Sequence, residues 1–371
     1  MVLGRTTARA CALGLSFFLG ACAGLAIELA GARPSASRAA GAEGPPGPEV
    51  PDIVASLAPR SGPTGGALPG LDAVVTRLGP GGAPSWTRAC SGDGALGEPA
   101  VAMDASGSAA LAVTFQGSID CGSGPVVAAG GPADFDALVA GIDPSGRVLW
   151  TRVASGAGPQ ALAAVAFDPW GGVLVAGSFA GTLDFAGQRL TASSELDVLV
   201  ARFEPSGALS WLRAFGQSSR NFGVDIAVAP TGSVFLLARG ATSIDLGAGV
   251  LGARGRASFV AVLDARGRTL HSRALSGAGD VLATRLRPTV DGGALVLGRF
   301  KGTADFGTGP LTSDPTSPAY TAEGEVFALR LTSSADPLWL ARAGDARDLL
   351  GWTLGRRSIP AAATLSMPIV Y

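Results

Sequence analysis

Four aspartates recur at one position of a repeated segment, and their spacing is the first sign of possible chemistry in the chain. They are Asp120, Asp184, Asp245 and Asp305, in segments such as GTLDFAG and GTADFG. Converging carboxylates could serve as general acid and base, or could bind a cation. We instead expect a structural role, because a residue present in every repeat is better suited to fixing a turn by accepting backbone N–H groups. No calcium-loop pattern accompanies them, so no metal site is predicted.

The remaining catalytic residue types give no assembled motif. The single histidine, His271, stands where other repeats have tryptophan, and we expect it to fill an aromatic slot. The chain has no Gly-x-Ser-x-Gly elbow, no P-loop and no dinucleotide fingerprint. We therefore predict no catalytic residues and no cofactor. The alternative is a polysaccharide hydrolase or lyase, which would need two carboxylates outside the repeat that converge in one pocket.

Two cysteines of the repeat region are predicted to form a disulfide. Cys90 follows Trp86 by four residues, where other repeats have Ala, Phe or Leu. Cys121 follows Asp120, where others have Phe or Leu. Two apolar positions thus become cysteine in the same repeat, and an exported chain meets oxidising conditions. The alternative is a pair of buried thiols that pack as small apolar side chains.

Three residues are candidates for contact with a partner. Trp170 lies in the turn Asp-Pro-Trp-Gly, where other repeats have Ser or Thr. A tryptophan at a turn tip is useful in recognition, although it could instead pack on a neighbouring loop. Arg220 and Asn221, in the loop SSRNFG, are weaker candidates of the same kind.

The elements that must position these residues are short strands. Trp86, Trp150, Trp211, His271 and Trp339 mark five repeats at intervals of 60 to 68 residues, and we call these five the marker residues. Apolar runs such as DALVAGI and DVLVARF precede the markers, and turns such as DPSG separate the two. A second strand–turn–strand follows, as in VAFDPWGGVLVAG. Each repeat therefore offers about four strands, without helical periodicity.

This combined pattern resembles the β-propeller repeats of secreted and surface proteins of high-GC bacteria, often labelled SBBP-type. The resemblance covers about residues 71 to 342 and implies a fold but no activity. We expect an all-β chain, a β-propeller of four-stranded antiparallel blades, with five blades. The alternative is four blades with closing strands.

The expected domain boundaries follow from the repeats. Residues 1–21 are a signal peptide, 22–66 an Ala/Gly/Pro-rich tether and 67–371 the propeller, in units of about 72–130, 131–191, 192–252, 253–320 and 321–371. The last unit lacks the Asp-Phe tail, so residues 349–354 and 361–367 are its expected third and fourth strands. Residues 53–57 are a weak candidate for a closing strand. Closure would hide the sheet edges.

The N-terminus and the overall charge bear on localisation. An apolar stretch follows Arg5 and Arg9 and contains Leu-Gly-Ala-Cys, which resembles a bacterial lipobox and implies lipidation of Cys22. Cleavage at Ala-Gly-Ala (residues 30–32) would instead give a secreted or periplasmic protein, and an uncleaved membrane anchor is a third alternative. The net charge of −1 offers no basic field for nucleic acid.

We therefore expect an exported, lipid-anchored protein of the outer membrane or cell surface. Its expected role is binding or scaffolding without catalysis, and its expected partner is a protein or glycan of the cell envelope.

Overall fold

The computed structural model describes residues 53–342, except 62–66, 80, 130, 132–133, 218–219, 241–242 and 318–319. In this part of the chain the regular elements are 27 strands. They are β1 (Ile53–Ser61), β2 (Ala67–Leu78), β3 (Pro84–Gly92), β4 (Ala100–Met103), β5 (Ala109–Phe115), β6 (Ser118–Asp120), β7 (Val126–Val127), β8 (Asp136–Ile142), β9 (Val148–Ala157), β10 (Gln160–Phe167), β11 (Val173–Phe179), β12 (Thr182–Phe185), β13 (Gln188–Thr191), β14 (Asp197–Phe203), β15 (Leu209–Phe215), β16 (Asn221–Val228), β17 (Val234–Gly240), β18 (Ser243–Asp245), β19 (Val250–Gly252), β20 (Ala257–Leu263), β21 (Thr269–Gly277), β22 (Asp280–Pro288), β23 (Ala294–Lys301), β24 (Thr303–Asp305), β25 (Pro310–Thr312), β26 (Glu325–Leu331) and β27 (Pro337–Arg342).

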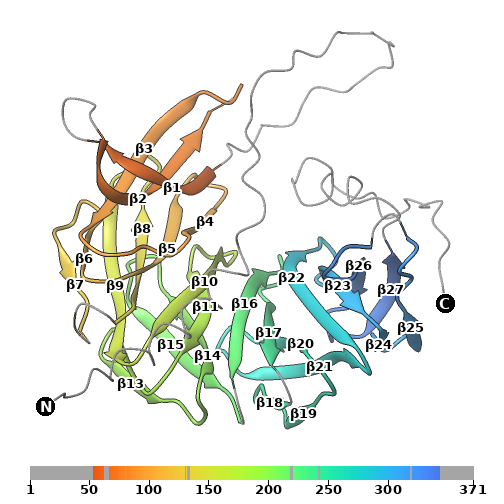
Figure 1. Ribbon diagram of the computed structural model, residues 1–371. Helices are drawn as coiled ribbons and strands as arrows, with labels where there is room; N and C mark the ends of the chain where they lie inside the picture. The colour runs from red at the N-terminus through yellow and green to blue at the C-terminus, as the bar shows by residue number, and fades with distance from the viewer. Residues whose placement is uncertain are drawn as a thin grey trace, which may run out of the picture. The chain divides into compact units, whose positions relative to one another are not determined.

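The strands form antiparallel sheets built on one plan (Figure 1). Four sheets contain the orders β4-β5-β8-β9, β10-β11-β14-β15, β16-β17-β20-β21 and β22-β23-β26-β27. The hairpins β12–β13 and β24–β25 extend the sheets of β9 and β21, and β18 pairs with β19. The first sheet has the order β1-β2-β3-β6-β7. The predicted all-β, antiparallel class is confirmed.

The sheets are displaced along the sequence by half a repeat from the expected units. β10 and β11 belong to unit 131–191, whereas their partners β14 and β15 belong to unit 192–252. The reason is the short hairpin β12–β13, which leaves the sheet after β11 and pairs back on β9, with Phe185 opposite Ala154. Each repeat therefore contributes to two consecutive sheets.

The central strands are buried along their whole length because both faces of each sheet are covered, and most of their residues are apolar. Every residue of β8, β11, β20 and β26 is buried. Phenylalanines fill the space between the sheets, among them Phe179, Phe203 and Phe300, which have no exposed surface. The first strand of a sheet also packs on the preceding sheet: β10 contacts β4 and β5, β16 contacts β10 and β11, and β22 contacts β16 and β17.

The expected tether, residues 22–66, overlaps a strand and is too long at its C-terminal end. Residues 53–61 form β1, which pairs antiparallel with β2, so that Leu57 lies opposite Ala73. The cause is the apolar alternation of Ile53, Ala55 and Leu57, which pack against the core of the first sheet. This strand is the weak candidate noted at residues 53–57, and its partner lies in the first sheet.

Several expectations concern residues outside the described part. They are the signal peptide 1–21, lipidation at Cys22, and the strands at 349–354 and 361–367. Among the described residues, no helix is long and apolar enough to cross a membrane. Among the described strands, no hydrogen-bonded pairing joins the last sheet to the first.

Candidate functional site

The recurring aspartates of the tails fix turns, as predicted. The Asp120 carboxylate accepts the backbone N–H groups of Gly122 and Gly124, at 2.7 and 3.1 Å. Asp245 accepts those of Gly247 and Gly249 at 2.7 and 3.2 Å. Asp305 and Asp184 make corresponding single bonds, to residues 307 and 187. The carboxylates are thus used within their own hairpins rather than gathered in one site.

A second set of acids fixes turns between neighbouring strands in three of the sheets. Asp143 accepts N–H groups two and four residues ahead, at 2.9 and 3.0 Å, and Asp104, Asp168 and Asp264 do the same. The hydroxyl of Ser145 and the N–H of Arg147 hold the pKa of Asp143 well below its usual value of 3.8. Each of these four carboxylates therefore closes its turn through two backbone hydrogen bonds.

The marker tryptophans connect consecutive repeats. The indole Nε1 of Trp86 donates to the carbonyl of Pro144, at 3.1 Å. In the same way Trp150 donates to Pro205, and Trp211 to Ala265, both at 3.0 Å. Each ring also covers the glycine of that turn: a Cβ added to residue 146, 207 or 267 would lie 2.5–2.8 Å from ring atoms. These three tryptophans therefore have a structural role.

The repeated arginines strengthen the same joint. Arg88 donates to the carbonyl of Gly146, Arg213 to that of Arg266, and Arg273 to that of Ala335. Arg273 also pairs with a turn acid, Asp336, at 2.9 Å. The guanidinium groups therefore lie on the turn of the next repeat.

His271 marks the joint that departs from the others. The turn held by Arg273 has Ala335 at the glycine position, with φ 63°. An alanine Cβ fits badly under an indole, which explains why this turn faces a repeat without a marker tryptophan. His271 itself is exposed. Trp150 and Trp211 are buried at the corresponding position, so the expectation that His271 fills the same aromatic slot is wrong.

Cys90 and Cys121 form the predicted disulfide. Cys90 precedes Ser91 of β3 and Cys121 follows Asp120 of β6, and Ser91 and Asp120 are paired. In the next repeat the same positions are Ala154 and Phe185, which lie opposite each other and are fully buried. The disulfide therefore replaces an apolar cross-strand contact in the interior.

Trp170 combines a fixed turn with an open side chain. Asp168 accepts its backbone N–H at 2.9 Å, and the same carboxylate pairs with Arg202 at 2.8 Å. The indole packs over Gly232 of the next sheet, where a Cβ would lie 2.4 Å from the ring. Even so, the residue is 61% exposed. Trp170 therefore packs on the neighbouring turn and also keeps most of its surface exposed to solvent.

The structure does not bring the other two contact candidates to Trp170. Arg220 lies 3.9 Å from Glu195 in an exposed ion pair, at the beginning of β16. The turn that Trp170 touches follows the end of β16, about 26 Å away for an eight-residue strand. Asn221 is fully buried, and its N–H donates to the carbonyl of Leu196. The prediction that Asn221 contacts a partner is therefore wrong. Asn221 is the first residue of β16, and the polar residues around it in the sequence gave no sign of this strand.

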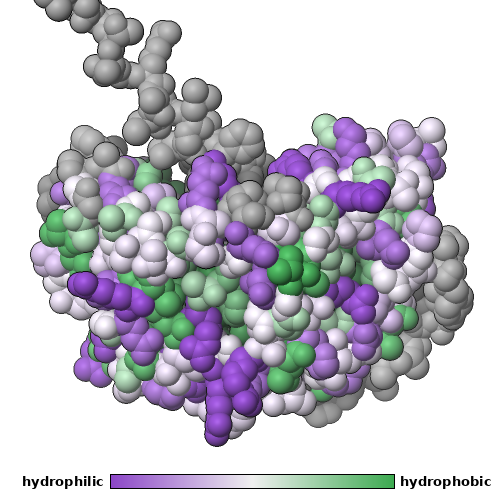
Figure 2. Space-filling model, turned by 90° about the horizontal axis from the view of Figure 1, so that it is seen from below, coloured by the Kyte–Doolittle hydropathy of each residue, from purple (hydrophilic) through white to green (hydrophobic). Residues whose placement is uncertain are grey.

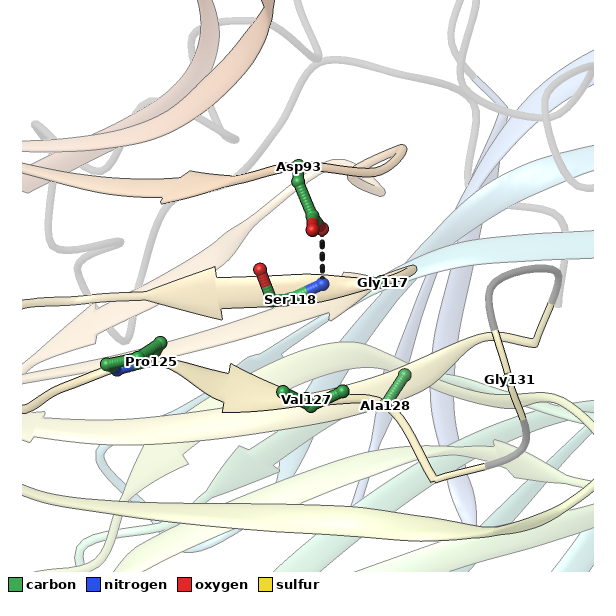
Figure 3. A pocket seen from close by; sticks show the side chains of 7 residues that line it. All are labelled: Asp93, Gly117, Ser118, Pro125, Val127, Ala128 and Gly131. Atoms are coloured by element: carbon green, nitrogen blue, oxygen red, sulfur yellow. Dashed lines mark hydrogen bonds between the residues drawn. The ribbon is translucent and has the colours of Figure 1, made fainter.

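An open hollow of about 420 Å³ lies beside β6 and β7 (Figure 3). Asp93 is the one carboxylic acid among its lining residues. Its carboxylate accepts the N–H of Ser118 at 2.5 Å, and these hydrogen bonds lower its pKa. The other named lining residues are Gly117, Pro125, Val127, Ala128 and Gly131. A lone ionised carboxylate has no partner acid among these lining residues, so they do not supply an acid–base pair.

Sequence reasoning missed the buried acids. Asp136 and Asp197 begin β8 and β14 and are almost fully buried. Asp136 accepts the N–H of Ala129, and Asp197 that of Ser193, both at 2.7 Å, so they hold the connections between strands. Their recurrence at the first residue of the apolar runs was a visible signal. Among the described residues, no group of three His, Cys, Asp or Glu side chains could hold a metal ion.

No protein-family model matches the chain, and no curated protein matches it in sequence. Among solved structures, a protein of unknown function from Bacteroides caccae is similar at 13% identity, with a TM-score of 0.38, over 74% of this chain and 77% of that one. A rhamnogalacturonan lyase from Bacillus licheniformis is similar at 13% identity, with a TM-score of 0.23, over 67% of this chain and 52% of the lyase. Similarity at this level carries no argument about function.

Proposed function

We propose that the protein is an exported β-propeller of five sheets that acts as a binding or scaffolding module of the cell envelope. The repeated joints between consecutive sheets support the propeller, because each sheet buries its faces against its neighbours. The disulfide Cys90–Cys121 supports export, since disulfides persist in oxidising compartments. The anchor in this proposal is a lipid on Cys22.

The observation that carries binding is the exposure of Trp170 on a turn that cannot rearrange freely. A large aromatic side chain on a fixed backbone loses little entropy when a partner covers it. Figure 2 shows hydrophobic residues interspersed among polar ones on one face of the molecule. Isolated anchors of this kind suit a protein or glycan partner recognised at a few points rather than over a broad apolar surface.

Comparison of Trp170→Ala with Val290→Ala tests this function. Val290 is an exposed apolar residue, 88% accessible, in the corresponding turn two sheets further on, so it is a matched control. The full-length tagged protein is used to capture proteins and glycans from envelope extracts. The affinity for captured partners should fall by about 30-fold with Trp170→Ala, which corresponds to the loss of a recognition hot spot of about 2 kcal/mol. The affinity should be unchanged with Val290→Ala. If both variants captured the same amounts of protein and glycan, the proposal that Trp170 contacts the partner would be wrong.

The anchor is tested separately. Metabolic labelling with a fatty acid should mark the protein, and Cys22→Ala should abolish the label and move the chain from the membrane to the soluble fraction. A labelled Cys22→Ala protein would contradict lipidation at that residue.

A further inference from the structure

Two departures from the repeat occur in the sheet β10-β11-β14-β15. The turn between β10 and β11 carries Trp170, where the other repeats have Ser, Thr or Asp. The turn between β14 and β15 begins with Glu204, where two other repeats have Asp. A site for a partner is added to a shared framework by residues of this kind, which individual repeats do not have in common.

Glu204 is used differently from the other turn acids. Asp143 and Asp264 each accept two backbone N–H groups of their own turns. In the turn of Glu204 the hydroxyl of Ser206 accepts the N–H four residues after the glutamate, at 3.4 Å, and the glutamate pairs with Arg202. That hydrogen bond lowers the pKa of Glu204 below its ordinary value of 4.5. Its carboxylate, 45% exposed, is therefore ionised and open to a hydrogen-bond donor from outside.

The turns of Trp170 and Glu204 lie side by side. A Cβ added to Gly171 would lie 3.5 Å from Cγ of Pro205, and these residues directly follow the tryptophan and the glutamate. The guanidinium of Arg202 bridges the two turns, because it pairs with Glu204 and with the aspartate that accepts the backbone N–H of Trp170. The aromatic residue and the carboxylate are therefore held near each other before any partner binds.

The indole of Trp170 is laid across the boundary to the next sheet. Cη2, at the far end of the ring, is the ring atom closest to Gly232, at 2.4 Å from a Cβ added there. A pocket of a partner protein would have to enclose this end of the ring, and Gly232 already occupies one side of it. The residue nevertheless remains 61% exposed. This geometry favours a partner that stacks on the ring over one that receives the ring in a pocket.

A neutral sugar ring fits the groups around the indole. The C–H groups of a pyranose form an apolar face that stacks on an aromatic ring, and its hydroxyl groups donate to carboxylate and hydroxyl oxygens. Glu204 supplies a carboxylate beside the turn of Trp170, and the exposed Thr231, next to Gly232, supplies a hydroxyl oxygen beside the end of the ring.

The charge of the site selects against acidic sugars. Glu204 is ionised, and a sugar carboxylate placed on the same indole would have to approach a like charge. The neighbouring cation does not relieve this repulsion, because the side chain of Arg202 is only 11% exposed and already pairs with two carboxylates. Unfavourable contacts of this kind discriminate between otherwise similar ligands.

We propose that the partner of the binding module is a neutral glycan, one pyranose ring of which stacks on Trp170 and donates hydroxyl hydrogens to Glu204 and Thr231. The inference rests on the binding function proposed above and names the chemical class of its partner. The groups are in place before binding, so few protein side chains have to be ordered. One small ring at an open surface still binds weakly, with an expected dissociation constant on the order of 1 mM.

Titration with defined oligosaccharides tests the proposal. The probes are neutral tetrasaccharides of glucose, mannose, galactose and xylose, with tetragalacturonate as the acidic comparison of equal length. They are added to the purified full-length protein in a detergent without a sugar headgroup, and binding is followed by saturation-transfer NMR. At least one neutral probe should bind with the expected affinity, and tetragalacturonate should bind at least about tenfold more weakly.

Three variants and a control assign the binding to these residues. Trp170→Ala should weaken binding of the neutral probe by at least about tenfold, whereas Trp170→Phe, which keeps an aromatic face, should weaken it by about threefold at most. Glu204→Gln should weaken it by about threefold and should also narrow its advantage over tetragalacturonate, because the repelling charge is gone. Val290→Ala is the control and should bind as the wild type does.

The outcomes separate this inference from the function on which it rests. The glycan assignment is overturned if no neutral probe binds up to about 10 mM, which is about ten times the expected dissociation constant. It is also overturned if tetragalacturonate binds equally well, or if Trp170→Ala leaves binding unchanged. If Trp170 is then still needed to capture proteins from envelope extracts, the binding function stands with a protein partner. If that capture does not depend on Trp170 either, both proposals are wrong.

Discussion

Replacement of Gly207 by alanine probes the joint between consecutive sheets. The residue has φ 79°, and its added Cβ would lie 2.5 Å from Cγ of Trp150. The left-handed backbone costs about 1–2 kcal/mol for a residue with a Cβ. Crowding of the indole adds about 1–3 kcal/mol. The free energy of unfolding should therefore fall by about 2–5 kcal/mol in total.

The joint marked by His271 suggests how to separate these two costs. Gly207→Ala is combined with Trp150→His, which reproduces the natural combination of His271 and Ala335. Trp150→His alone should cost about 2–4 kcal/mol, because a buried aromatic surface is lost. In that background the alanine has no indole to crowd, so Gly207→Ala should cost only about 1–2 kcal/mol. The resulting coupling energy should be about 1–3 kcal/mol.

Gly187→Ala is the control for the backbone alone. Its φ is 83°, and a Cβ added there meets nothing within 4 Å. Urea unfolding followed by circular dichroism measures all five proteins, wild type and four variants, without depending on tryptophan emission. The account of the joint is wrong if Gly207→Ala costs no more than Gly187→Ala, or costs the same in the Trp150→His background as in the wild type.

Three further predictions concern the disulfide and two aspartates. Cys90→Ala with Cys121→Ser should lower the free energy of unfolding by about 2–4 kcal/mol in urea. Cys121→Phe in place of serine should recover part of this loss, because the next repeat has the apolar pair Ala154 and Phe185. Asp245→Ala should cost about 1 kcal/mol in the same assay, through the lost bonds to Gly247 and Gly249; an unchanged midpoint would contradict the turn-fixing role. Burial raises the pKa of the Asp225 carboxyl above 3.8. The protonated carboxyl therefore contributes to stability below pH 3.8, and this contribution is lost as the pH rises through the raised pKa. Unfolding free energies measured from about pH 3 upward should show this loss in the wild type and not in Asp225→Asn.

Residues that recur in the repeats could be predicted from sequence. The apolar runs, the turn glycines and the tail aspartates each depend on local backbone geometry, which the neighbouring residues specify. The disulfide was predictable for a related reason. Cys90 and Cys121 replace residues that other repeats keep apolar, so the comparison between repeats placed both in the interior.

Features that depend on distant partners could not be predicted in the same way. The repeat gives the period of the sequence but not the boundary between one sheet and the next. That boundary is set by the pairing of β12 with β9. β1 was hidden by its proline-rich surroundings, because its pairing with β2 needs only a short apolar alternation. The burial of Asn221 and the exposure of Trp170 depend on neighbouring sheets, which local sequence does not specify.

The joint made by tryptophan, glycine and arginine has a consequence for the growth of such a protein. Each of these three indoles reaches into the turn of the following repeat, so the first three repeats make the same contact with their successors, whereas the repeat marked by His271 does not. A gene that gained or lost one of the first three repeats would still encode matching connections among them. Repeat number can therefore vary among the repeats that share this joint, while the repeat of His271 and its successor must change together.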